Sequence, residues 1–218
     1  MILRTLAIVF FVMVGCSEQS EKSGEKSVLK TAPGKHSQGV IVALGDSLTE
    51  GYSIDEENAY PARLEKKLRE NGYDYRVVNA GISGETSAGT LARVDWIMSL
   101  KPDIVILETG ANDGLRGLDP ELTKENIRKI IRRFKEENVQ VILAGMKMFQ
   151  SLGRGYSENF NSIYPELAES EEVDFIPFFL EGVAGKPELN LSDGIHPNEK
   201  GYGIVVDLVY PYVVNALS

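Results

Sequence analysis

The chain has 218 residues, which is enough for one domain with a sizeable hydrophobic core. Hydrophobic residues make up 43% of it and charged residues 25%, as is usual for a soluble globular protein. A formal net charge of −9 gives a nucleic-acid partner no electrostatic support, so this class of partner is not expected.

The first 15 residues have the pattern of a signal peptide. A single cation, Arg4, precedes an apolar run that is too short to span a bilayer as a stable helix. The run ends at Cys16, the only cysteine, so no internal disulfide can form. The segment "VMVGC" resembles the lipobox of bacterial lipoproteins, which implies a lipidated Cys16 and a membrane-anchored protein of the bacterial cell envelope, on its periplasmic or extracellular face. The alternative is an ordinary secreted protein with a spare thiol.

Residues 16–38 are expected to form a disordered tether. They are polar, contain almost no apolar side chains and cannot bury a core. A coil of about twenty residues has an end-to-end distance of roughly 25 Å. His36, one of the two histidines of the chain, lies in this segment, and we expect no catalytic role for it. The folded domain is therefore expected to span residues 39–218.

In this domain, short apolar runs rich in β-branched residues alternate with segments of helical periodicity. The expected strands are "VIVAL" (40–44), "YRVVNA" (75–80), "DIVILET" (103–109), "VQVILAG" (139–145) and "VDFIPFF" (173–179). Strands that are apolar on both faces suit the centre of a parallel sheet covered by helices.

The intervening segments predict amphipathic helices. They are expected around 64–68, from 91 to 98, between 119 and 138, and from about 198 to 217 with a bend at Pro211. In the third of these, Ile127, Ile130, Ile131 and Phe134 follow the i, i+3, i+4, i+7 spacing of a buried face. Repeated strand–helix alternation predicts an α/β fold: a doubly wound, three-layer α/β/α sandwich with a mostly parallel, five-stranded sheet and no second domain.

Sheets of this kind place their sites at the carboxyl ends of the strands. Ser47 in "ALGDSLTEGY", Gly81 in "NAGISGET" and Asn112 in "TGANDGLRG" each follow an expected strand. Taken singly, a helix cap explains the serine, and turns explain the glycine and the asparagine. Their shared position at one edge of the sheet favours a site.

The turn "LSDGIHPN" contains the single histidine of the folded part, His196, three residues after Asp193. In a tight turn, this spacing lets the carboxylate accept the Nδ1–H of the imidazole and leaves Nε2 free to accept a proton from a serine hydroxyl. The alternative is a structural histidine at a helix start. Asp46 is adjacent to Ser47, so the two side chains should diverge, and we interpret Asp46 as a structural hydrogen-bonding residue.

Together, "GDSL", "NAGISGET", "GAND" and "DGIHPN" closely resemble, in order and spacing, the four blocks of the SGNH (GDSL-type) hydrolases over essentially all of residues 39–218. "NDGLRG" and "YPELAES…IPFFLEGVAGKPELNLSDGIHPN" are similar to the bacterial branch of acyl-CoA thioesterases/lysophospholipases and arylesterases. The resemblance implies a flavodoxin-like fold and a serine esterase that acts through an acyl-serine intermediate.

The resemblance also implies a role for each block residue. Ser47 is expected to be the nucleophile, His196 the base and Asp193 the acid that orients it. The Ser47 and Gly81 amides and the Asn112 side chain are expected to form the oxyanion hole, since fixed N–H donors stabilise the tetrahedral intermediate.

The segment "GLRGLD" (114–119) is a candidate substrate loop by the same resemblance, and "GMKMFQSLGRGY" (145–156) offers apolar side chains for an acyl pocket. The residues expected at the substrate are Gly114, Leu115, Arg116, Met146, Met148 and Phe149. Packing beneath a loop is the alternative explanation for the apolar ones.

No cofactor is expected. One usable histidine without a nearby cysteine gives no metal-ligand cluster, and the glycines lack the spacing of a nucleotide-binding loop. The expected substrates are small acyl esters or thioesters such as aryl esters, lysophospholipids or acyl-CoA. Two alternatives stay open, a carbohydrate O-deacetylase and a non-catalytic surface lipoprotein.

Overall fold

The computed structural model describes residues 37–149 and 153–217, so the expected leader, Cys16 and most of the expected tether lie outside the described residues. In the described part, one sheet has the order β2-β1-β3-β4-β5. Its strands are β1 (Gly39–Gly45), β2 (Tyr75–Gly81), β3 (Ile104–Glu108), β4 (Gln140–Ala144) and β5 (Asp174–Ile176). Every neighbouring pair is parallel, which confirms the predicted fold class.

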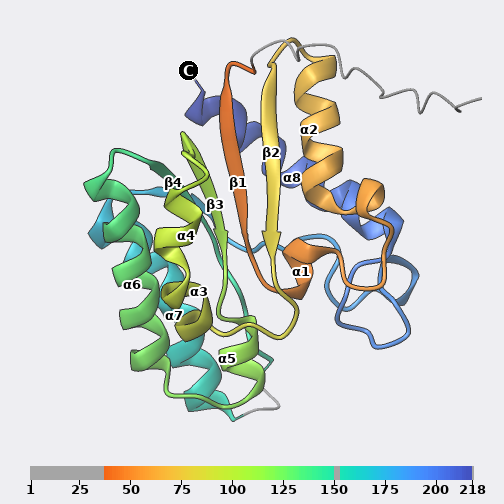
Figure 1. The fold of residues 1–218 in the computed structure, drawn as a ribbon. Helices are drawn as coiled ribbons and strands as arrows, with labels where there is room; N and C mark the ends of the chain where they lie inside the picture. The colour runs from red at the N-terminus through yellow and green to blue at the C-terminus, as the bar shows by residue number, and fades with distance from the viewer. Residues whose placement is uncertain (1–36, 150–152, 218) are drawn as a thin grey trace, which may run out of the picture. The chain divides into compact units, whose positions relative to one another are not determined.

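Helices cover both faces of the sheet (Figure 1). On one side lie α2 (Tyr60–Glu70) and α8 (Glu199–Ala216), which pack against each other. On the other lie α3 (Ser87–Ala92), α4 (Val94–Met98), α6 (Pro120–Glu136) and α7 (Arg154–Glu171). Short helices occupy the connections: α1 (Ser47–Glu50), α5 (Ala111–Leu115) and the 3-10 turns η1 (Glu56–Asn58) and η3 (Pro187–Leu189).

The buried faces follow the hydrophobic periodicity of the sequence. In α6, the four residues at helical spacing, Ile127, Ile130, Ile131 and Phe134, are all fully buried. Side chains of this size contribute about 1.5–3 kcal/mol each when they leave water. Asp119 caps this helix by accepting a hydrogen bond from the Glu121 amide, and Pro120 follows as the first helical residue.

The expected helix over 91–98 is two helices. The backbone leaves the helical region at Arg93 (φ −111°, ψ 9°), which separates α3 from α4. The periodicity of apolar residues runs through this break because Leu91, Val94 and Ile97 still face the protein. The break leaves the Arg93 side chain turned inward, where it is only 13% exposed.

The strand order fixes where a site can lie. Successive connections run from β1 outward to β2 and then back across the sheet to β3, so the chain changes direction between β1 and β3. Ligands bind in such sheets at this switch point, outside the carboxyl ends of the strands. In residues 37–149 and 153–217, no helix combines the length and apolarity needed to cross a membrane.

Candidate active site

Ser47 begins helix α1 directly after β1. The side chain of Asp46 caps this helix by accepting a hydrogen bond of 3.0 Å from the Leu48 amide. The strand ends at Gly45, where a Cβ atom would lie 2.2 Å from Thr49 Oγ1 and 2.5 Å from Glu108 Oε2. The turn is therefore tight and packed, and it holds a serine that is only 8% exposed at the carboxyl end of β1.

Two hydrogen bonds link Ser47, His196 and Asp193 in series. Ser47 Oγ lies 2.8 Å from His196 Nε2, and His196 Nδ1 lies 2.8 Å from Asp193 Oδ2. The imidazole is thus held at both nitrogens, with the carboxylate on Nδ1 and the hydroxyl on Nε2, the arrangement that a serine nucleophile needs for activation. As expected, the carboxylate that reaches the imidazole belongs to Asp193, while Asp46 makes other contacts.

The turn itself orients Asp193. Its Oδ1 accepts hydrogen bonds from the Ile195 amide (2.8 Å) and the His196 amide (3.0 Å). Burial acts to raise the pKa of Asp193, but these backbone bonds and the imidazole outweigh it and lower the pKa to about 2. The turn is closed by a hydrogen bond from the Leu191 amide to the His196 carbonyl, at 2.8 Å. Asp193 is therefore a carboxylate throughout the neutral range.

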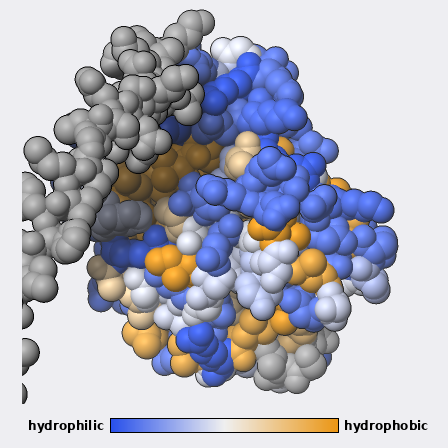
Figure 2. Space-filling model, turned by 45° about the vertical axis from the view of Figure 1, so that its right-hand side comes forward, coloured by the Kyte–Doolittle hydropathy of each residue, from blue (hydrophilic) through white to orange (hydrophobic). Residues whose placement is uncertain are grey.

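A cavity of about 290 Å³ opens beside the serine. Its wall includes Ser47, Tyr52, Ser83, Gly84, Asn112, Leu115, Ile195 and His196. Three of these are large apolar or aromatic side chains that remain 44–45% exposed at the rim, namely Tyr52, Leu115 and Ile195. The site thus offers a small pocket with an apolar entrance. Figure 2 shows one face of the molecule, on which apolar patches interrupt a hydrophilic surface.

Tyr52 is a site residue that was not expected from the sequence. Its ring lies 4.5 Å from that of His196, centroid to centroid, with the planes tilted by 35°. The signal was present in "GDSLTEGY", but the tyrosine follows a left-handed turn at Gly51 (φ 89°), and its direction could not be inferred from the letters.

The amide donors around the cavity differ from the prediction at one position. The Gly81 amide donates to Asn79 Oδ1 at 3.0 Å, and Gly81 is not part of the cavity wall. A Cβ atom there would lie 2.1 Å from the Glu50 amide nitrogen, so close packing of α1 on β2 explains this glycine. The expected role of Gly81 in the oxyanion hole is therefore corrected.

Gly84, three residues further along the same loop, lies at the cavity instead. It lines the cavity with a φ of +76°, which favours glycine. No described residue accepts a hydrogen bond from its amide, and the same holds for the Ser47 amide. Asn112 donates one Nδ2 hydrogen to Asp46 Oδ2 at 3.0 Å, which leaves its second hydrogen for a ligand.

A second buried carboxyl group, that of Glu108, binds the loop that carries the nucleophile. Its Oε2 accepts hydrogen bonds from the Asp46 amide (3.2 Å) and from Thr49 Oγ1 (2.8 Å). Burial raises the pKa of Asp46 to about 6, and burial together with the charge of Asp46 raises that of Glu108 well above the ordinary range. Glu108 belongs to an expected strand and had no expected role, although one carboxyl in an apolar run was a signal.

The structure places only some of the expected substrate residues at the cavity. Leu115 lines the cavity, and Arg116 Nη2 donates to the Gly84 carbonyl at 2.7 Å. Gly114 packs on Met148, whose Sδ would lie 2.5 Å from a Cβ atom at position 114. Met146 and Met148 are buried in the core, and Phe149 is 62% exposed. None of the last three lines the cavity, which corrects the expected acyl pocket and favours the packing alternative for the two methionines.

A serine, a histidine and an aspartate in hydrogen-bonded series at the carboxyl ends of a parallel sheet define a serine hydrolase. Residues 43–204 match the model of the GDSL-like Lipase/Acylhydrolase family. The chain belongs to this family and is a serine esterase whose substrates are small-molecule esters.

Proteins similar in sequence to this chain include an arylesterase and a thioesterase. An arylesterase of Vibrio mimicus is 36% identical over 217 residues, which is 99% of this chain and 100% of the relative. A protein of Escherichia coli (strain K12) called thioesterase 1/protease 1/lysophospholipase L1 is 39% identical over 77% of this chain and 79% of its own length. Among solved structures, that of TesA has a TM-score of 0.78 at 37% identity, over 81% of this chain and 99% of the other.

Proposed function

We propose that Ser47 attacks the carbonyl carbon of a small acyl ester or thioester while His196 Nε2 takes the hydroxyl proton. The observation that carries this role is the 2.8 Å contact between Ser47 Oγ and Nε2, with Asp193 fixing the opposite nitrogen at 2.8 Å. Asp193 holds the tautomer that leaves Nε2 unprotonated and stabilises the imidazolium once it forms.

The remaining steps return the enzyme to its starting state. The tetrahedral intermediate collapses, the bond to the leaving alcohol or thiol breaks, and His196 gives that group its proton. Water then attacks the acyl-serine, again losing a proton to His196. The bond from the acyl carbon to Ser47 Oγ breaks, His196 returns this proton to Oγ, and the carboxylic acid leaves. Each proton that the base accepts is therefore returned, and no cofactor is needed to balance the reaction.

The oxyanion of the intermediate is stabilised in this proposal by the amides of Ser47 and Gly84 and by Asn112. The first two have no acceptor among the described residues, and the third has a spare hydrogen. All three residues line one cavity beside the nucleophile. Donors held by the backbone and by Asp46 need no reorganisation when negative charge develops, which is the condition for effective stabilisation.

The substrates that best fit are aryl esters and thioesters with a short or medium acyl group. A cavity of about 290 Å³ with an apolar rim accepts a modest acyl or aryl group, and the relatives include an arylesterase and a thioesterase. An acetylxylan esterase of Xylanibacter ruminicola is less similar, 24% identical over 83% of this chain. A series of p-nitrophenyl esters and acyl-CoA thioesters tests the preference, and strict selectivity for acetyl groups would favour a carbohydrate deacetylase instead.

A fluorophosphonate probe tests the nucleophile directly. Wild type should be labelled at Ser47, and Ser47→Ala should not. His196→Ala should lose as much activity as Ser47→Ala, and the double variant should lose no more, because the two groups act as a unit. A folded protein that neither reacts with the probe nor hydrolyses any ester of the series would favour the non-catalytic alternative.

We further propose that Cys16 carries a lipid anchor that holds the enzyme in the bacterial cell envelope. The apolar run before Cys16 and its position as the only cysteine support this. Two or three acyl chains hold a protein firmly, whereas one holds it weakly. Cys16→Ser should move the protein out of the membrane fraction of bacteria, and a wild type found wholly in the soluble fraction would contradict the anchor.

A further inference from the structure

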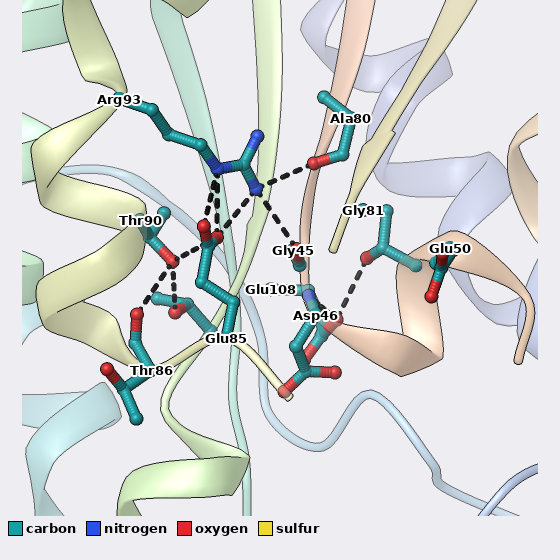
Figure 3. A network of polar contacts seen from close by, with 12 residues as sticks. Gly45, Asp46, Glu50, Ala80, Gly81, Glu85, Thr86, Thr90, Arg93 and Glu108 are labelled. Carbon is teal, nitrogen blue, oxygen red and sulfur yellow. Dashed lines mark hydrogen bonds and ion pairs between the residues drawn. The ribbon is translucent and has the colours of Figure 1, made fainter. Parts of the chain in front are cut away.

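Arg93 lies at the break between α3 and α4 and makes contacts that the helical spacing of its neighbours does not explain. Its side chain is largely buried. One nitrogen, Nη2, donates to the Ala80 carbonyl at 2.7 Å and to the Gly45 carbonyl at 3.2 Å. The guanidinium thus joins the last residue of β1 to the next-to-last residue of β2 (Figure 3).

The guanidinium also pairs with Glu85, through Nε and the same Nη2. Arg93 Nε lies 2.8 Å from Oε1 and 2.9 Å from Oε2, and Nη2 lies 2.7 Å from Oε2. Thr90 Oγ1 also donates to Oε2, at 3.0 Å. A Cβ atom on Gly89 would lie 2.7 Å from the Glu85 Cγ, so α3 leaves this side chain no room to move away. Figure 3 shows Glu85 between the guanidinium and Thr90.

These contacts bear on the oxyanion hole because the residues that Arg93 holds are close neighbours of its donors in the sequence. Gly45 is separated from the nucleophile Ser47 by one residue, and Glu85 is bonded to Gly84. The Gly84 loop leaves β2 after Gly81, so Arg93 holds the chain just before the start of this loop, at Ala80, and again directly after Gly84. The same nitrogen holds the end of the nucleophile strand.

We propose that Arg93 is a positioning residue that sets the distance between the Ser47 and Gly84 amides, acting through Glu85 and the two strand-end carbonyls. This inference rests on the proposed oxyanion hole. The planar fork of arginine reaches a carboxylate and two carbonyls at once, which a lysine ammonium on a flexible stem cannot do. Arg93 Nη1 is buried without a partner among the described residues, so the placement carries a desolvation cost that packing alone does not explain.

The test compares two conservative substitutions. Arg93→Lys keeps the charge but not the fork, and we expect kcat on a p-nitrophenyl ester to decrease by about 10- to 100-fold, with KM changed less than about twofold, because misplaced donors weaken transition-state binding selectively. Arg132→Lys is the matched control. Arg132 forms a similar bidentate pair with Glu171, through Nε at 3.0 Å and Nη2 at 2.8 Å, between α6 and α7. It should lose stability but keep kcat.

Glu85→Gln provides a second variant in case Arg93→Lys folds poorly, and it should lower kcat in the same selective way. Circular dichroism and the melting temperature are measured for each protein. Equal kcat in Arg93→Lys, Glu85→Gln and Arg132→Lys, or a change confined to KM, would overturn the inference. Asn112→Ala distinguishes failure of the proposed oxyanion hole from failure of the positioning role. If the kcat of Asn112→Ala also matches wild type, the proposed oxyanion hole is wrong. If only the Arg93 and Glu85 variants match wild type, the positioning role alone is wrong.

Discussion

Asp46 Oδ2 accepts a hydrogen bond of 3.0 Å from Asn112 Nδ2, so the residue before the nucleophile holds a side chain that comes from a different strand end. Its other oxygen caps α1 through the Leu48 amide. Both carboxylate oxygens are thus engaged away from the imidazole, whose Nδ1 pairs with Asp193. The two aspartates of the site therefore have separate duties: Asp193 acts on the base, and Asp46 on the geometry around the nucleophile.

Neutralising each aspartate should separate these duties. Asp193→Asn should lower kcat by about 10⁴, because the imidazole is free to adopt the wrong tautomer and its cation loses stabilisation. Asp46→Asn should leave measurably more activity and mainly lower the melting temperature, since one of the two acceptor oxygens becomes an NH₂ group that cannot accept from the Leu48 amide or Asn112. kcat on a short p-nitrophenyl ester and thermal unfolding by circular dichroism distinguish the two. A folded Asp193→Asn enzyme near the wild-type rate would contradict the triad.

Removing the amide donor of Asn112 should affect the transition state alone. Asn112→Ala should lower kcat by about 10²–10³ with little change in KM, the usual effect of losing one oxyanion donor. Asn126→Ala is a control, because this asparagine is buried, does not line the cavity and donates to Ser87 Oγ at 3.0 Å. It should reduce stability and keep kcat. An effect of Asn112→Ala on KM only would mean that Asn112 binds the ground-state substrate.

The two glycines of the second loop should respond in opposite ways to alanine. At Gly81 the new Cβ meets the Glu50 backbone at 2.1 Å, so Gly81→Ala should lower the melting temperature strongly. At Gly84 there is room, with Arg116 Nη2 as the nearest atom at 3.6 Å, but φ is +76°. Gly84→Ala should therefore fold and lose kcat as the strained backbone turns its amide. If Gly84→Ala kept full kcat, the corrected assignment of the amide would be wrong.

The buried pair of Asp46 and Glu108 should make stability depend on pH. A raised pKa means that the folded protein keeps a proton that the unfolded chain releases above its ordinary carboxyl pKa of ~4. The stabilisation is therefore complete below about pH 4 and is lost as the pH rises through the folded pKa, which is about 6 for Asp46. The free energy of unfolding should decrease across this range.

Glu108→Gln tests this directly, because it removes one of the two titrating groups and keeps the shape. Its free energy of unfolding, measured with urea at pH 4.5, 5.5 and 7, should decrease less from pH 4.5 to pH 7 than that of wild type. Glu137→Gln, on the exposed end of α6, is the control and should follow the wild-type profile. Parallel profiles for all three proteins would show that Glu108 does not hold a raised pKa.

The sequence was sufficient for the features that depend on short spacings. The turn from Asp193 to His196 could be predicted because its contacts lie within four residues, and the buried face of α6 because its periodicity is regular. The parallel sheet could be predicted from alternating runs whose strands are apolar on both faces.

The features that the sequence did not indicate depend on contacts between distant segments. Glu108 meets Asp46 and Thr49 about sixty positions away along the chain, and a carboxyl in an apolar run does not reveal its partner. Gly81 was predicted for the oxyanion hole, and only the hydrogen bond from its amide to Asn79 Oδ1 shows that this donor is already engaged. Likewise, Arg93 lies within an apolar periodicity that continues across a break in the helix.

Apart from the contact of Nε2 with Ser47, the hydrogen bonds that orient His196 arise inside its own turn, from Asp193 and from the Leu191 amide, which donates to the His196 carbonyl. Asp193 and His196 therefore form a local structural unit, and its internal geometry does not depend on the length of the chain that leads to it. Insertions between β5 and this turn, a stretch of the chain that contains η3, could remodel the substrate entrance while leaving the acid–base pair intact. In this part of the chain, the substrate specificity can therefore change while the catalytic acid–base pair is kept.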